Sequence, residues 1–270
     1  MSIKVPPGAC DTHMHFYDRN VPPAPGTPMP GHFDVPMYRA LQKRLGVQRV
    51  VVVQPNAYRD DNRVTMDAVR ALGRAARAVA VVGETTPEAE LERLTTAGVV
   101  AQRFFNLPNG SVPFSRMDAI MARVHSFGWH ANLQLDGRDL PKYEAQIRRL
   151  PGKFVVDHNG KYMEPVAPEH ESFLVLKKLL DTGRCWVKLS APYETSKTGA
   201  PKYEDVSKLA RALVKHAPER MLWASNWPHP SVPPGTVDDL DLLNLLADWA
   251  PKEADRKKLL VDNPAELYGF

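Results

Sequence analysis

The stretch VPMYRALQKRLGVQRVVVVQ, residues 35–54, contains the unit that decides the fold. In VPMYRALQKRLG the apolar residues recur every three or four positions, which predicts a helix with one buried stripe, and Gly46 supplies the usual C-terminal stop. The run RVVVVQ, residues 49–54, is apolar until a glutamine and a proline stop it. Such a run is typical of a buried strand that leaves a sheet.

The same alternation of strand and helix repeats along the chain. Eight β-like runs occur: ACDTHMH (9–15), RVVVVQ (49–54), AVAVVG (78–83), GVVAQRFF (98–105), GWHANLQL (128–135), KFVVDH (153–158), RCWVKLS (184–190) and RMLWAS (220–225). Amphipathic segments lie between them, among them TMDAVRALGRAARA (65–78), PEAELERLTTAG (87–98), MDAIMARVHSFG (117–128) and EDVSKLARALVKHAP (204–218). Eight such units in 270 residues predict one α/β domain over residues 1–270, a (β/α)8 TIM barrel, with an open doubly wound sheet as the alternative.

The bulk composition limits the classes of partner. The formal net charge of +4 comes from scattered basic residues, so we expect no nucleic-acid-binding face, although a mild positive field can favour a small anionic substrate. No run approaches the ~18 apolar residues of a membrane span, and the N-terminus lacks the apolar core of a signal peptide, which predicts a cytoplasmic protein. Cys10 and Cys185 fall in the first and seventh predicted strands, and we expect two buried free thiols.

Three Pro/Gly-rich segments interrupt the alternation, and each follows a predicted strand. They are residues 20–36, 191–203 and 227–236. Barrel enzymes place their chemistry at the C-terminal ends of the strands, and long loops there usually cover a site. Polar residues also gather at these ends: His13 and His15, Gln54 and Asn56, Glu84, Arg103, Gln134, His158, Lys188 and Ser190, and Asn226. Their convergence predicts an active site at the barrel mouth.

His13 and His15 form the sharpest local signal. Residues two apart on a strand project to the same face, so the two imidazoles should lie side by side. Such a pair suits either a metal ion or a substrate carbonyl held by hydrogen bonds. Asp11 is expected on the same face, where it could orient one of the rings.

Several ordered motifs resemble the amidohydrolase superfamily. They are DTHMH (11–15), RF (103–104), VVDHNGK (155–161), SNWPHP (225–230) and the closing LVDNPAELYGF (260–270). Within it the chain resembles the branch of pyrone-dicarboxylate lactonase and D-galactarolactone isomerase. QPNAYRDDN (54–62) and APYETSK (191–197) look more like the isomerase. The resemblance covers essentially the whole chain and implies a lactone substrate.

The resemblance also bears on a metal. Metal-using members add a Lys or Glu on strand four, histidines on strands five and six, and an Asp on strand eight, where this chain has Arg103, Gln134, His158 and Asn226. Three neutral imidazoles, those of His13, His15 and His158, could still hold zinc. Arg103 and Lys161 would place positive charge beside the ion, which is unfavourable in a low-dielectric pocket. We therefore predict neither a metal nor another cofactor.

Asn226 bears on the reaction. A lactone hydrolase must activate water with a base, and an amide cannot accept the proton. A lactone isomerase needs no water, because the substrate's own hydroxyl attacks the acyl carbon. The prediction is therefore isomerisation of lactones of sugar dicarboxylic acids. The alternatives are lactone hydrolysis, with His229 or Glu84 as the base, and a non-catalytic barrel that binds sugar acids.

Each candidate residue has an expected role. The three histidines should polarise the lactone carbonyl, Arg103 and Lys161 should bind its carboxylate, and Asn226 should orient the substrate. The remaining candidates for substrate binding are Gln54, Asn56, Gln134, Tyr193 and His229.

Overall fold

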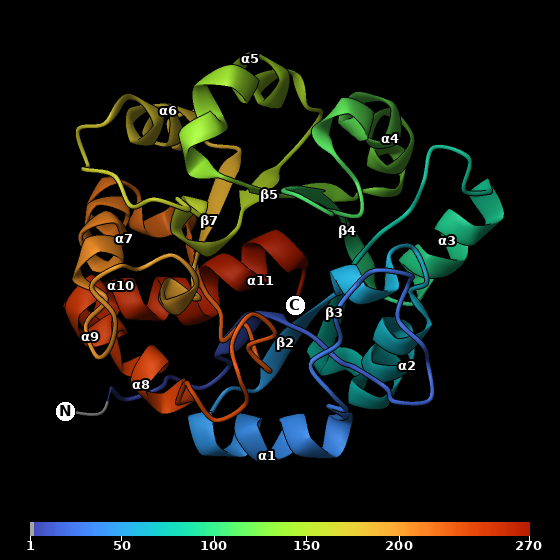
Figure 1. Ribbon diagram of the computed structural model, residues 1–270, viewed down its shortest axis with the longest axis horizontal. Coiled ribbons are helices and arrows are strands. Elements are labelled where there is room, and N and C mark those ends of the chain that lie inside the picture. The colour runs from blue at the N-terminus through green and yellow to red at the C-terminus, as the bar shows by residue number, and fades with distance from the viewer. Residues whose placement is uncertain (1–2) are drawn as a thin grey trace.

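Eight parallel strands follow one another around a ring in the order of the chain, and helices enclose the ring (Figure 1). The computed structural model describes residues 3–270. The strands are β1 (Cys10–Met14), β2 (Arg49–Val53), β3 (Ala76–Ala80), β4 (Val99–Asn106), β5 (His130–Leu135), β6 (Phe154–Val156), β7 (Cys185–Leu189) and β8 (Met221–Trp223). The helices are α1 (Val35–Leu45), α2 (Arg63–Leu72), α3 (Glu88–Thr96), α4 (Met117–Val124), α5 (Leu140–Arg149), α6 (Glu171–Leu180), α7 (Glu204–His216), α8 (Asp239–Asn244), α9 (Leu246–Trp249), α10 (Glu253–Lys257) and α11 (Asn263–Tyr268).

The ring closes between β8 and β1 through bonds made mostly beyond the end of β8. The backbone N–H of Asn226 donates to the carbonyl of His13 at 2.9 Å, and that of His15 donates to Trp227 at 2.8 Å. The sequential strand order and this closure confirm the predicted (β/α)8 barrel and exclude the open doubly wound sheet.

The continuous apolar runs arise because each strand is buried on both faces. In β2, Val51 and Val53 point into the barrel, whereas Val50 and Val52 pack against the surrounding helices. At the opposite end from the mouth, Tyr268 of α11 packs against the ring of His130 at a centroid distance of 5.5 Å. Figure 1 accordingly shows α11 lying across the middle of the ring. The chemistry is therefore confined to one end of the barrel.

The third strand begins earlier than the sequence analysis predicts. Residues 65–78 were expected to be helical, but α2 ends at Leu72, and Gly73 follows with φ of 70°. This left-handed conformation is open to glycine and stops the helix. β3 then starts at Ala76, inside the predicted helix. The helical spacing of the apolar residues does not predict that the helix ends before Gly73.

Two further predictions, on the cysteines and on the Pro/Gly-rich segments, are confirmed. Cys10 and Cys185 are buried and unpaired. All three Pro/Gly-rich segments reach the mouth of the barrel, where they supply Pro28 and Pro30, Glu194, and Pro230 with Ser231. Within residues 3–270, no helix is both long and apolar enough to cross a membrane.

Candidate active site

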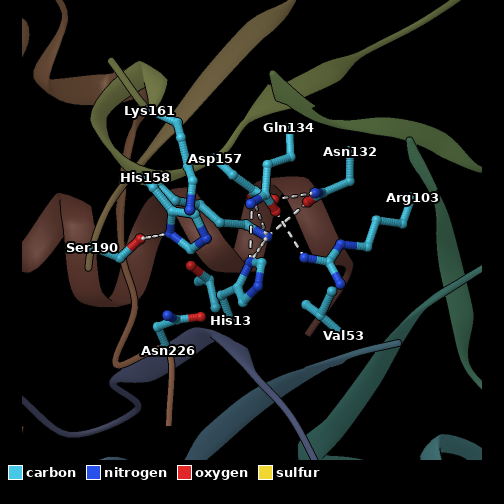
Figure 2. Close-up of polar contacts among 12 residues, drawn as sticks. His13, Val53, Arg103, Asn132, Gln134, Asp157, His158, Lys161, Ser190 and Asn226 are labelled. Atoms are coloured by element: carbon cyan, nitrogen blue, oxygen red, sulfur yellow. Dashed lines mark hydrogen bonds and ion pairs between the residues drawn. The ribbon is translucent and has the colours of Figure 1, made fainter. Parts of the chain in front are cut away.

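A cavity of about 260 Å³ lies at the C-terminal ends of the strands. Its polar lining is His15, Asn56, Arg103, Gln134, His158, Lys161, Glu194, Asn226 and Ser231. Most of the predicted site residues are therefore brought together. His13 is fully buried and lies directly beneath this lining, in contact with the rings of His15 and His158 (Figure 2).

The register of β1 shifts between Asp11 and Met14. Because of this irregularity, Asp11 does not face the same side of the strand as His13 and His15. His13 and His15 remain neighbours, with their Nε2 atoms 3.3 Å apart. Asp11 faces the other way, where it accepts from Tyr38 Oη at 2.9 Å and from Ser225 Oγ at 2.5 Å. The prediction that Asp11 orients a histidine ring is wrong, because an irregular register breaks the strict alternation of faces.

The hydrogen bonds of His13 and His15 assign their protons. The carbonyl of Val53 can only accept, so His15 Nδ1, 2.7 Å away, carries the hydrogen and His15 Nε2 holds a lone pair. His13 Nδ1 lies 3.1 Å from Lys188 Nζ, which can only donate, and 3.3 Å from Asp157 Oδ1, which can only accept. Because Lys188 is the nearer group, we assign the lone pair to His13 Nδ1. His13 Nε2–H then points at His15 Nε2. Both rings are neutral in this arrangement, in agreement with burial, which lowers the pKa of His15 to about 3.

A buried ion pair lies under the histidines. Lys188 Nζ lies 3.2 Å from Asp157 Oδ1 and donates to Asn132 Oδ1 at 2.7 Å, and Asn132 Nδ2 donates to Asp157 Oδ2 at 2.8 Å. Burial raises the pKa of Asp157, but Lys188 and His13 outweigh it and hold the pKa well below its usual range. All four side chains are fully buried. The pair carries no net charge and fixes His13 from below.

One group of potential metal ligands occurs in the described part of the chain. It consists of His13, Asp157 and His158, whose ligand atoms lie within 4.8 Å of one another. The Lys188 ammonium already contacts two of these three residues, at 3.1 and 3.2 Å. A divalent cation bound among them would lie beside this buried positive charge, and the repulsion opposes binding. While Lys188 is protonated, the donor set does not fit a resident metal ion.

His158 lies in a tight turn after β6, the 3-10 turn His158–Gly160. His158, Asn159 and Lys161 all have positive φ angles, between 48° and 57°. Non-glycine residues rarely adopt this conformation, and such strain gathers at functional sites. The turn aims His158 and Lys161 into the cavity, and Ser190 Oγ holds His158 Nδ1 at 2.8 Å. With Nδ1 accepting from Ser190, His158 Nε2–H would be free to donate to a ligand.

The burial of His158 predicts a pH-dependent stability. Burial is the main cause that lowers the pKa of His158 from 6.5 to about 4. Since the folded-state pKa lies below the unfolded value, the free energy of unfolding should fall as the pH drops from 6.5 to 4. The contribution of His158 to this loss is about 3 kcal/mol. Urea denaturation of the wild type and of His158→Asn at pH 7 and pH 4.5 would measure it.

Asparagine is the matched replacement, because it tolerates the left-handed backbone at this position and can still hydrogen-bond Ser190. The variant should lose less stability than the wild type on acidification. An equal loss in the two proteins would contradict the assignment of a neutral, buried imidazole at position 158.

Arg103 enters the cavity from β4. Its guanidinium donates to the carbonyl of Gln54 at 2.6 Å and to Gln134 Oε1 at 2.8 Å, and it is 4% exposed. These bonds fix its orientation and leave further N–H groups for a ligand. Gln54 contributes only its backbone, because its side chain bonds Thr65 Oγ1 and the carbonyl of Asp61, away from the cavity. The Gln54 side chain does not line the cavity, and its role in substrate binding stays a prediction.

Asn226 has a fixed amide. Its Nδ2 donates to Tyr193 Oη at 2.9 Å and faces Glu194 Oε1 at 3.3 Å. A carboxylate and a hydroxyl held in this way select the amide nitrogen, so Oδ1 faces the other side. Figure 2 shows the amide oxygen on the side of His13. Asn226 therefore presents an acceptor to the cavity.

Tyr193 and His229 lie behind Asn226 and do not line the cavity. Tyr193 Oη and His229 Nδ1 are 2.9 Å apart, and His229 Nε2 lies 3.1 Å from Asp239 Oδ1. They hold Asn226 in position, and their contact with substrate stays a prediction. Glu84, the other alternative base, accepts from Arg116 at 2.8 Å and is also absent from the lining.

Glu194 places a carboxylate in the cavity that the sequence patterns do not predict. It lies in the 3-10 turn Pro192–Glu194 after β7 and pairs with Lys161 in the cavity. Neither Glu194 nor the roles of Asp157, Lys188 and Asn132 are predicted by the sequence patterns. A charged Lys188 inside the apolar run RCWVKLS was the available signal, because a buried ammonium requires a partner.

Sequence comparisons show which known proteins this chain is similar to. The amidohydrolase family model matches residues 10–270. The chain is 38% identical to D-galactarolactone isomerase of Agrobacterium fabrum, over 97% of this chain and 91% of that protein. It is 36% identical to 2-pyrone-4,6-dicarboxylate hydrolase of Comamonas testosteroni, over 98% of this chain and 92% of that protein. It is 35% identical to 4-sulfomuconolactone hydrolase of Rhizobium radiobacter, over 100% and 92%.

A solved structure shows the same fold over nearly the whole chain. The apo crystal structure of an Agrobacterium tumefaciens protein superposes with a TM-score of 0.92 at 38% identity, over 98% of this chain and 97% of that one. The barrel, its ordered strand-end residues and the match to the family model lead to one assignment. The chain belongs to the amidohydrolase family.

Proposed function

We propose that this protein isomerises lactones of sugar dicarboxylic acids, exchanging one ring size for another without a metal ion. The observation that carries the proposal is the fixed amide of Asn226, which presents an acceptor and no proton-accepting carboxylate to the cavity. The 38% identity to a galactarolactone isomerase supports the same choice. A cytoplasmic location and the absence of a nucleic-acid partner stay predictions from the sequence.

Arg103 is the group proposed to bind the free carboxylate of the lactone. Its guanidinium is buried and held by Gln54 and Gln134, so little conformational entropy is lost when a carboxylate binds. Asn226 Oδ1 would accept from the substrate hydroxyl that attacks. Fixing this hydroxyl against the acyl carbon can supply ~7–11 kcal/mol of barrier lowering.

The three histidines are proposed to have different roles. His158 Nε2–H would donate to the lactone carbonyl, as an oxyanion-hole group does. His15 Nε2 already accepts from His13 Nε2–H, and burial lowers the pKa of His15 to about 3, so His15 is not assigned as a base. The new C–O bond forms, the old ring C–O bond breaks, and the proton of the attacking hydroxyl ends on the departing oxygen. This replaces the expectation that all three imidazoles donate, because His13 Nε2–H already points at His15.

Hydrolysis is the second candidate, because a carboxylate is present after all. Glu194 Oε1 lies 3.3 Å from Asn226 Nδ2, and two relatives are named as hydrolases. Burial raises the pKa of Glu194, but Lys161, His158 and Ser231 outweigh it and lower the pKa to about 2. So acidic a carboxyl group is a weak base. Isomerisation is therefore preferred to hydrolysis as the proposed reaction.

A proton NMR time course on galactarolactones, run with and without a chelator, tests the proposal. Ring exchange that is unaffected by the chelator is expected, because a metal ion bound among His13, Asp157 and His158 would lie beside the Lys188 ammonium. Loss of exchange after chelation would contradict metal independence, and clean conversion to the open diacid would favour the hydrolase. Calorimetric binding without turnover would favour a non-catalytic barrel.

A further inference from the structure

Three charged side chains line the cavity: Arg103, Lys161 and Glu194. Lys161 Nζ is paired with Glu194 Oε2, and the two side chains are only 10% and 8% exposed. Beneath them, Lys188 and Asp157 cancel each other's charge. Two cations and one anion leave the lining with one net positive charge, which resides at Arg103.

Glu194 is held in place from several sides. Besides Lys161, Ser231 Oγ donates to Glu194 Oε1 at 2.7 Å, and Asn226 Nδ2 faces the same oxygen at 3.3 Å. These partners come from the loops after β6 and β8, whereas Glu194 follows β7. A carboxylate bonded from two other loops is a built part of the cavity, and it occupies the place at Lys161 that a second substrate carboxylate would take.

We propose that Glu194 sets the charge of the substrate, so that the site takes lactones with one free carboxylate and rejects lactones with two. The inference rests on the proposed function, since it takes the ligand to be an anionic lactone. One carboxylate can bind Arg103. A second carboxylate would lie against Glu194, or would have to displace it from Lys161 and leave it buried without a partner. Both outcomes are costly, and such repulsion is a usual source of specificity.

The test measures binding preference with probes that cannot be hydrolysed. The 6-carboxylate and the 4,6-dicarboxylate of 2-pyridone share one ring and differ by one charge, and their lactam resists ring opening. Isothermal calorimetry would give the ratio of their dissociation constants. The wild type should prefer the monocarboxylate. Glu194→Gln frees Lys161, and the ratio should move toward the dicarboxylate about tenfold, as expected for one additional charge-assisted contact.

Two further variants separate a local from a general effect. Glu84→Gln removes the same charge from an exposed pair with Arg116 outside the cavity, so it should leave the ratio unchanged. The double variant Lys161→Met with Glu194→Gln returns the lining to one positive charge and should restore the preference for the monocarboxylate. Circular dichroism of each variant checks the fold.

The role of Glu194 and the proposed function can be refuted by different results. An unchanged ratio in Glu194→Gln, an equal shift in Glu84→Gln, or failure of the wild type to bind the monocarboxylate would overturn the role of Glu194. A different result would refute the proposed function. A wild type that shows the expected binding ratio but exchanges no lactone rings would refute isomerisation and leave the charge selection standing.

Discussion

Asn226→Asp is expected to convert ring exchange into hydrolysis, with the open diacid forming about 10²-fold faster than in the wild type. The new carboxylate would stand where Asn226 Oδ1 now faces the cavity, and it could accept a proton from water. The backbone should tolerate the change, because Asn226 has φ of 60°, a conformation that Asp also adopts more readily than most residues. Proton NMR of the products would measure both rates.

The pH profile of this variant provides an independent check. Position 226 lies 3.3 Å from Glu194 Oε1, so the two carboxylates would repel each other and the pKa of the pair would rise. Hydrolysis should therefore increase as the pH rises through a value above the ordinary pKa of Asp, since only the deprotonated form acts as base. Asn226→Gly is the matched control, because glycine accepts the same backbone angle and offers no base. Hydrolysis by the glycine variant at the rate of the aspartate variant would contradict this account.

Lys188→Met should lower the free energy of unfolding by about 3–5 kcal/mol at pH 7. The variant leaves the Asp157 carboxylate buried without its ammonium partner. The pKa of Asp157 would then rise above its unfolded value, so the deficit should be largest at pH 7 and should shrink as the pH falls toward 5. Urea denaturation of the wild type and the variant at both pH values would measure the difference.

The double variant Asp157→Asn with Lys188→Met separates stability from activity. It removes both charges, so most of the lost stability should return. Activity should stay reduced by about 10–100-fold, because His13 Nδ1 has lost the donor that fixes its tautomer. A single variant as stable as the wild type at pH 7 would refute the ion pair, and full activity in the double variant would refute the positioning role of Lys188.

Patterns local in sequence predicted most of the barrel. Runs such as RVVVVQ report burial on both faces, and the two-residue period of His13 and His15 placed their rings together. Local patterns failed where the backbone departs from regular geometry. The register shift in β1 turned Asp11 away from the site, and Gly73 ended α2 early.

The barrel and most of the polar residues at its mouth follow from the sequence alone, because periodicity and strand-end position depend on near neighbours along the chain. The partners of these polar residues are set by contacts between segments that lie far apart in the sequence. Lys188 meets Asp157 across adjacent strands, and Glu194 meets Lys161 and Ser231 from different loops. Protonation states and net charge at the cavity follow from these long-range contacts, since a buried charge is defined by the groups that surround it.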